Sequence, residues 1–200
     1  MLYVQTDIFE QEIKVKTNMR VIAFMGSPRK NGSTDKLVKQ ILAGATSAGA
    51  QTEEFFLNDL NIRGCQACMY CKSHIECSQK DNMPQLTEEI KRADRLVFAA
   101  PIYMGGINAQ SKTFLDRLYV FGTAENQPGK IPTGKKAALM FSHASPDENS
   151  FCQNVEPIAR FLERLGVKIT DTLFAAGGPK ALDDEGFMQR VFQAGVYLVQ

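Results

Sequence analysis

Residues 20–34 read Arg-Val-Ile-Ala-Phe-Met-Gly-Ser-Pro-Arg-Lys-Asn-Gly-Ser-Thr, a short apolar run followed by a polar loop that contains two glycines. The uninterrupted apolar run up to Met25 is typical of a strand that is covered on both faces. A helix is predicted after the loop, with Ser33 or Thr34 as its N-cap and Gly49 at its end. The apolar residues at helical spacing are Leu37, Val38, Ile41, Leu42 and Ala45.

The alternation of strand and helix continues along the chain. Further strands are predicted at Thr52–Leu57, Arg95–Ala100 (closed by Pro101), Ala137–Phe141 and Lys168–Phe174. Further helices are predicted at Glu88–Ala93, Ala109–Tyr119, Phe151–Leu165 and Glu185–Val199. Because a crossover helix returns the chain to start another parallel strand, we expect a doubly wound α/β domain, a five-stranded parallel sheet with helices on both faces. Ligands of such sheets bind beyond the carboxyl ends of the strands, so the loops after the first, third and fourth strands are candidates.

Length and charge exclude several classes of protein. The 200 residues, at 22.2 kDa, suffice for one full core but not for two ordinary domains. The net charge of +1 argues against nucleic acid or an acidic membrane as the main partner. No apolar stretch is long enough to cross a bilayer. Residues 1–18 lack the apolar segment of a signal peptide, so we expect an N-terminal extension, a single domain over residues 19–200 and a cytoplasmic location.

The loop at Gly26–Thr34 has the composition of a phosphate-binding loop. Backbone N–H groups at a helix start and the helix dipole favour an anion, and the hydroxyls of Ser27, Ser33 and Thr34 can add hydrogen bonds. Arg29 can close over a phosphate through its planar guanidinium. The loop lacks the Gly-Lys-Ser/Thr of a nucleoside-triphosphate site and the glycine spacing of a dinucleotide site. The alternative interpretation is a simple turn and helix cap.

Two other loops are predicted to lie at the same edge of the sheet. Pro101–Gly106 offers an aromatic ring, a thioether and backbone amides, which suit a flat heteroaromatic ligand. The alternative is an ordinary loop whose Tyr103 packs on the surface. In Ser142–Ser145, the corresponding loop after the fourth strand, His143 either contacts the ligand or a substrate or is a capping or solvent residue.

Four cysteines fall within one segment, residues 64–83, as Cys65-x2-Cys68-x2-Cys71-x5-Cys77. In a chain without an export signal, such clustering indicates metal or redox chemistry more readily than disulfides. Four thiolates from one loop suit an iron–sulfur cube. Zinc, or a disulfide or peroxide-sensing thiol pair, is a lesser possibility. The fifth cysteine, Cys152, is interpreted as a small, half-buried apolar residue.

Three motifs together resemble a known family: GSPRKNGST at residues 26–34, the cysteine run, and AAPIYMGGINAQSKTFLDR at residues 99–117. From about Val21 to Thr172 the chain is similar to the flavodoxin-like NADPH-dependent FMN reductases, and within them to the iron–sulfur flavoproteins. The resemblance implies strand order 2-1-3-4-5 and a non-covalently bound FMN. The FMN phosphate would lie in the first loop, and the flavin ring against the second and third loops. The FMN-binding residues implied are Ser27, Arg29, Asn31, Ser33, Thr34, Pro101, Ile102, Tyr103, Met104, Gly105, Ser142 and His143.

The same resemblance implies a 4Fe-4S cluster held by Cys65, Cys68, Cys71 and Cys77. The implied function is electron transfer between a donor, NAD(P)H or ferredoxin, and an acceptor, in a homodimer or homotetramer. The sequence departs from the family at His143 and Ser145, where relatives often carry glycines, and in the residues that precede Met19. A cluster-free NAD(P)H-dependent FMN or quinone reductase and a non-enzymatic flavin-binding redox sensor remain alternatives, and the cysteines would then be vestigial or prone to oxidation.

Overall fold

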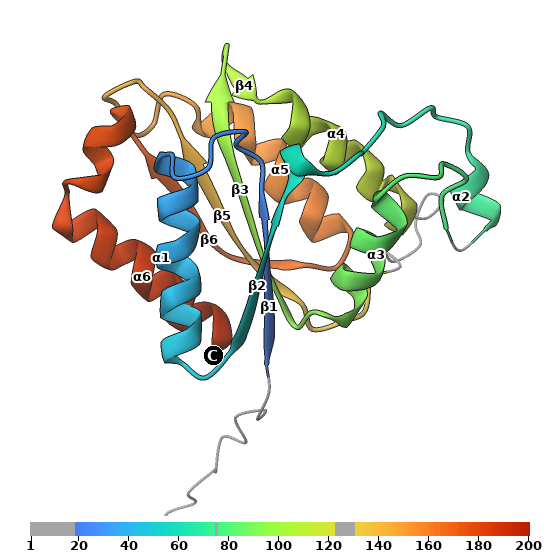
Figure 1. Ribbon diagram of the computed structural model, residues 1–200, viewed down its shortest axis with the longest axis horizontal. Coiled ribbons are helices and arrows are strands. Elements are labelled where there is room, and N and C mark those ends of the chain that lie inside the picture. Colours follow the sequence, from blue (N-terminus) through green and yellow to red (C-terminus); the bar gives the residue numbers. More distant parts are fainter. Residues whose placement is uncertain (1–18, 75, 123–130) are drawn as a thin grey trace, which may run out of the picture.

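The computed structural model describes residues 19–74, 76–122 and 131–200 (Figure 1). The predicted extension, residues 1–18, lies outside the described residues. The strands are β1 (Arg20–Met25), β2 (Gln51–Phe56), β3 (Arg95–Tyr103), β4 (Gly106–Ile107), β5 (Lys136–Ser142) and β6 (Lys168–Ala175). The helices are α1 (Ser33–Ser47), α2 (Tyr70–Ser73), α3 (Met83–Arg92), α4 (Ala109–Arg117), α5 (Cys152–Arg164) and α6 (Glu185–Val199).

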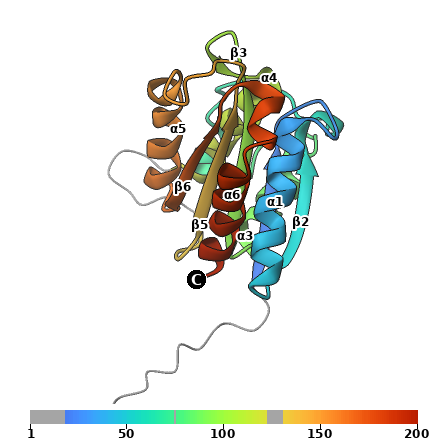
Figure 2. The ribbon, with the colours of Figure 1, turned by 90° about the vertical axis from the view of Figure 1, so that its left-hand side faces the viewer.

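The sheet has the order β2-β1-β3-β5-β6 with every neighbouring pair parallel, and β4 pairs antiparallel with the end of β3. Because β5 and β6 are the fourth and fifth parallel strands, the predicted doubly wound fold and strand order are confirmed. Helices α1 and α6 cover one face of the sheet, and α3, α4 and α5 cover the other (Figures 1 and 2).

The central strand β1 contributes to both cores. Val21, Ala23 and Met25 pack on the side of α1, whereas Ile22 and Phe24 pack on the side of α3 and α4. Successive side chains of a strand point to opposite faces, so a strand covered on both sides needs apolar residues throughout. This explains the uninterrupted apolar run in the sequence.

The prediction that Pro101 closes the third strand is wrong, because β3 continues to Tyr103. The Ala99 carbonyl accepts from the Gly26 N–H on the β1 side, and the pairing of β1 with β3 ends at Met25 and Ala99. Two residues further on, the backbone N of Pro101 faces the same side, where β1 has already ended. A parallel ladder would next have an N–H of residue 101 donate to the Gly26 carbonyl; the Asn108 side-chain amide donates to it instead, so the proline leaves no unpaired carbonyl there. Beyond it, β3 turns back as a hairpin into β4.

Two helix starts also differ from the prediction. The N-cap of α1 is Gly32, neither Ser33 nor Thr34, and no side chain caps this end among the described residues. Helix α3 begins at Met83, five residues before the predicted Glu88, because Pro84 is compatible with a first helical turn. No helix among the described residues is long and apolar enough to span a membrane.

Helices α1 and α6 pack closely through two glycines. A Cβ atom on Gly195 would lie 1.9 Å from the Ile41 carbonyl oxygen, and one on Gly44 would lie 2.0 Å from the Phe192 carbonyl oxygen. Both contacts are with backbone atoms, which cannot rotate away. The two helices therefore approach each other at a distance that only glycine allows at these positions.

We expect Gly195→Ala to lower the free energy of unfolding by about 1–3 kcal/mol, the usual range for overpacking a core. Alanine is the better helix former, so a loss would come from the contact and not from helix propensity. Chemical denaturation measures it. Gly64→Ala is the matched control, because nothing lies within 4 Å of a Cβ atom there. Equal losses in the two variants would contradict the prediction.

Candidate functional site

The loops after β1, β3 and β5 meet at the carboxyl edge of the sheet, as predicted. The strand register places Met25 beside Ala99 and Pro101 beside Ser142. The first and third loops are in direct contact, because the Thr34 and Ser142 hydroxyl oxygens lie 2.7 Å apart in a buried hydrogen bond. Residues 108 positions apart in the chain therefore form one wall.

The first loop begins in close contact with α4. The Gly26 carbonyl accepts from the Asn108 side-chain amide at 2.7 Å, and a Cβ atom on Gly26 would lie 1.8 Å from the Ser111 hydroxyl oxygen. Among the described residues, the Ser111 hydroxyl and the Asn108 Oδ1 atom are buried without a hydrogen-bond partner. Sequence reasoning missed both residues, although Asn108 occupies the N-cap position of α4.

The predicted phosphate-binding residues differ in exposure. Ser27 and Thr34 are buried and Ser33 is half-buried, whereas Arg29 and Asn31 are exposed to solvent. The Ser27 hydroxyl accepts from the Arg29 backbone N–H at 3.2 Å. Asn31 has a φ of 61°, in the left-handed region that asparagine tolerates better than most residues. The loop is therefore tightly folded, with its two cations, Arg29 and Lys30, outside.

A fully buried carboxylate behind this loop was also missed. The Asp35 Oδ2 atom accepts from the Asn31 backbone N–H at 2.5 Å and pairs with Lys39 Nζ at 3.0 Å. Glu54 on β2 lies on the same side of the sheet. Burial, and then the charge of Asp35, raise the pKa of Glu54 to about 7, and Lys39 offsets only part of this. An acidic residue in the first helical turn is the only sequence signal for Asp35.

The second loop is a hairpin that protrudes from the edge of the sheet. Pro101 and Ile102 are buried within β3, whereas Tyr103 is partly exposed and Met104 is fully exposed. Met104 and Gly105 form the tip with φ values of 49° and 84°. Two successive left-handed residues are typical of a tight two-residue hairpin. The protein's own packing thus leaves the Tyr103 and Met104 side chains available for contact with a ligand or another molecule.

His143 is buried in the third loop, so its interpretation as a capping or solvent residue is wrong. Its ring packs edge-on against Phe151, with centroids 5.0 Å apart, and α5 begins only at Cys152. Among the described residues, neither ring nitrogen has a hydrogen-bond partner. Burying an unpaired polar group is costly, which indicates that a further partner completes this site.

The cysteine segment runs from the end of β2 to α3 and packs beside α4 (Figure 1). Cys65 and Cys68 are exposed, and Cys71 and Cys77 are half-buried, all as free thiols. The Cys68 sulfur lies 3.6 Å from the Ser78 hydroxyl oxygen. Hydrogen bonds from the Tyr70 backbone and then from Ser78 hold the pKa of Cys68 below its usual value.

The four thiols are not gathered around one point. Within residues 19–74, 76–122 and 131–200, no three cysteine, histidine, aspartate or glutamate side chains converge as a metal-binding group. The chemistry of the four thiols suits an iron–sulfur cluster, but the observed arrangement would have to tighten to hold one. Cys152 is half-buried against the core, as predicted.

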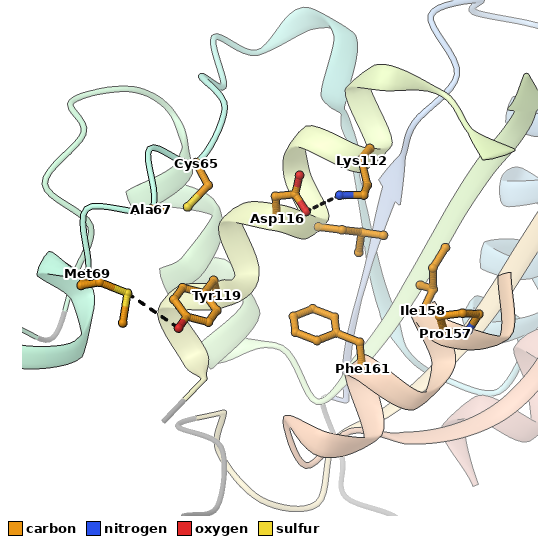
Figure 3. A pocket seen from close by; sticks show the side chains of 10 residues that line it. Cys65, Ala67, Met69, Lys112, Asp116, Tyr119, Pro157, Ile158 and Phe161 are labelled. Atoms are coloured by element: carbon orange, nitrogen blue, oxygen red, sulfur yellow. Dashed lines mark hydrogen bonds and ion pairs between the residues drawn. The ribbon is translucent and has the colours of Figure 1, made fainter. Parts of the chain in front are cut away.

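An apolar groove of about 480 Å³ lies between the cysteine segment, α4 and α5 (Figure 3). Cys65 and Met69 line one side, and Phe161 from α5 lines the other. At its rim, the Lys112 and Asp116 side chains form an exposed ion pair at 2.6 Å. Sequence reasoning missed this groove, because it depends on how two helices and a loop pack together.

We expect Glu54→Gln to stabilise the protein more at pH 8 than at pH 4. The folded-state pKa of Glu54, about 7, lies above the ordinary value of 4.5, so folding favours the protonated form. The resulting loss of stability grows as pH rises from about 4.5 through 7, and glutamine does not ionise. Chemical denaturation at both pH values measures the difference. A gain in the free energy of unfolding from Glu54→Gln that is the same at both pH values would contradict the raised pKa of Glu54.

Comparison with known proteins identifies the family to which this chain belongs. The profile of the NADPH-dependent FMN reductases matches residues 19–160. An iron–sulfur flavoprotein of Archaeoglobus fulgidus is 31% identical over 112 residues, which cover 56% of this chain and 51% of the relative. An iron–sulfur flavoprotein of Methanocaldococcus jannaschii is 35% identical over 99 residues, which cover 50% of this chain and 51% of the relative. The chain thus matches about half the length of these curated relatives.

A solved structure extends the likeness in fold to most of the chain. The NAD(P)H:quinone oxidoreductase from Methanothermobacter marburgensis superposes with a TM-score of 0.73 at 20% identity, covering 90% of this chain and 99% of that one. At this identity the likeness concerns the fold alone. The family profile, by contrast, spans the first loop, the cysteine segment and the hairpin, and it confirms the resemblance inferred from their motifs. The chain belongs to the NADPH-dependent FMN reductase family.

Proposed function

We propose that this protein is an FMN-dependent oxidoreductase that binds FMN at the carboxyl edge of the sheet. The observation that carries the proposal is the junction of the first and third loops through Thr34 and Ser142, beside a helix start that no side chain caps among the described residues. Family membership supports the same cofactor.

The residues present suit a bound flavin phosphate. The uncapped amino end of α1 leaves backbone N–H groups that can donate hydrogen bonds to an anion. Ser33 is the first residue of this helix, and Ser27 and Thr34 bring two further hydroxyls to the same loop. Lys39 balances the charge of Asp35, so the buried carboxylate behind the loop does not leave the site with a bare negative charge.

The residues at the ring position suit a flat heteroaromatic ligand. The hairpin presents the exposed Tyr103 ring and the backbone around Gly105. His143 brings two buried ring nitrogens without a partner among the described residues, and a polar ligand edge could satisfy one of them. When bound, FMN supplies the redox chemistry, because it accepts electrons in pairs and can pass them on singly. The chain itself binds and orients the cofactor and shields part of it from water.

We further propose that Cys65, Cys68, Cys71 and Cys77 hold a 4Fe-4S cluster. Their spacing on one loop and the curated iron–sulfur flavoproteins among the relatives support this ligand set. Electrons would then pass between NAD(P)H or ferredoxin and an acceptor.

We also propose a homodimer or homotetramer, which the solvent-open apolar groove along α4 supports.

A second candidate function is a cluster-free NAD(P)H-dependent FMN or quinone reductase. It is favoured by the observation that, among the described residues, no three cysteine, histidine, aspartate or glutamate side chains form a group that could hold a metal ion. The two functions share the FMN site, and they differ in what the cysteine segment binds.

Replacing Ser33 and Thr34 together with alanine should raise the Kd of FMN about a hundredfold or more. Each hydrogen bond to a charged group contributes roughly 1.5–3 kcal/mol, and two would be lost. Fluorescence titration of the apoprotein with FMN measures the change. Ser47→Ala, at the opposite end of α1, is the control and should leave the Kd unchanged. Equal affinities in the double variant and the wild type would refute the phosphate-loop assignment.

Anaerobic purification should yield about four iron and four sulfide per chain together with FMN, as a ligated cube requires. Cys71→Ser should lower the iron content and leave FMN bound, because the two sites use different residues. Cys152→Ser is the control and should keep both. A yellow protein without iron after anaerobic reconstitution would contradict the cluster and support the cluster-free reductase.

A further inference from the structure

A buried ion pair lies at the base of the cysteine segment. Arg117 is the last residue of α4, and Asp81 lies two residues before α3. Their side chains are 1% and 0% exposed, respectively. Arg117 Nη1 lies 2.5 Å from Asp81 Oδ2, and Nη2 lies 3.2 Å from Oδ1, so the guanidinium binds the carboxylate through two parallel hydrogen bonds. Such bidentate pairs are the geometrically specific form of an arginine–carboxylate contact.

The pair joins the two flanks of the segment to each other. Arg117 Nη1 also donates to the Arg63 carbonyl at 2.6 Å, and Asp81 accepts from the backbone N–H groups of Arg63 and Met83, both at 3.0 Å. Arg63 precedes the first cysteine of the run, and Asp81 follows the last. The four acceptor positions of the Asp81 carboxylate are therefore filled, and the residues that bracket the cysteines are held side by side.

The closed base lies near one of the cysteines in the chain, because Cys77 stands four residues before Asp81. Burial alone would lower the pKa of Arg117, but the hydrogen bonds to Asp81 and its negative charge raise it. Ser78, the neighbour of Cys77, lies beside the Cys68 sulfur. The residues just before Asp81 in the chain therefore include Cys77 and also Ser78, which contacts a second cysteine of the run, Cys68.

We propose that Arg117 is a positioning residue for the cysteine segment: it closes the base of the segment on Asp81 and so restrains Cys77, four residues before Asp81. Closing the base before any metal arrives removes part of the entropy cost of bringing ligands on a flexible loop together. The inference deepens the proposed function, on which it rests for the role of the cysteines. The closure itself is a property of the metal-free chain and can be measured there.

The first test compares thiol reactivity in the reduced, metal-free protein. In Arg117→Gln, the rate of maleimide labelling at Cys77, measured by peptide mass spectrometry relative to Cys152, should rise about tenfold or more, because the loss of the charged hydrogen bonds to Asp81 opens the base of the segment. Cys152 is a suitable internal reference, because it is also half-buried. Arg160→Gln is the matched control: its ion pair with Glu156 is exposed, and the labelling ratio should not change.

Asp81→Asn and the double variant separate positioning from general loosening. If both residues act through one clasp, Asp81→Asn should also raise Cys77 labelling, and the double variant should add little to either single change. Arg117→Lys should restore part of the protection, because lysine keeps the charge but lacks the planar fork. After anaerobic reconstitution, the iron content per chain should be lower in Arg117→Gln than in Arg160→Gln.

The proposal is overturned if Cys77 labelling in folded Arg117→Gln stays within about twofold of the wild type, or if the effects of the two single variants simply add. Should Arg117→Gln fail to fold, Asp81→Asn decides by the same criterion. Failure of the proposed function is distinguishable, because a wild-type protein that binds no iron would refute the cluster and leave the labelling comparison intact.

Discussion

The close contact between Gly26 and α4 is the constraint on which the site depends. Where β1 ends, the Gly26 N–H donates to the Ala99 carbonyl, and the Gly26 carbonyl accepts from the Asn108 side-chain amide. Both polar groups of the Gly26 backbone are therefore hydrogen-bonded. A side chain at this position would collide with Ser111. The chain therefore leaves the sheet directly against α4, and this fixes where the first loop and the start of α1 lie relative to β3.

Helix α4 carries this constraint to the cysteine segment. Its amino end, at Asn108, contacts the first loop, and its last residue, Arg117, is paired with Asp81. At 1.5 Å per residue, the nine residues of the helix span about 13 Å. A helix of this length, packed in the core through Phe114 and Leu115, is a stiff connection. One secondary-structure element thus sets the spacing between the proposed FMN site and the proposed cluster site.

Much of the fold could be predicted from the sequence, because local periodicity reports burial. The apolar run of β1 and the helical spacing in α1 and α6 located these elements to within about two residues of the observed bounds. The end of β3 could not be located in this way. Pro101 stops a strand only where a neighbour requires its N–H, and whether β1 reaches that far is a property of the assembled sheet.

The sequence by itself determined the alternation of strands and helices, the loops that gather at the carboxyl edge and the spacing of four cysteines on one segment. These features follow from residues close together in the chain, where periods of 2 and 3.6 residues and turn chemistry operate. Only the tertiary structure decided that Asp35 and His143 are buried and that Asp81 pairs with Arg117, 36 residues away. The reason is physical: loss of solvent and pairing of distant charges depend on which elements pack against each other, and no local pattern encodes that.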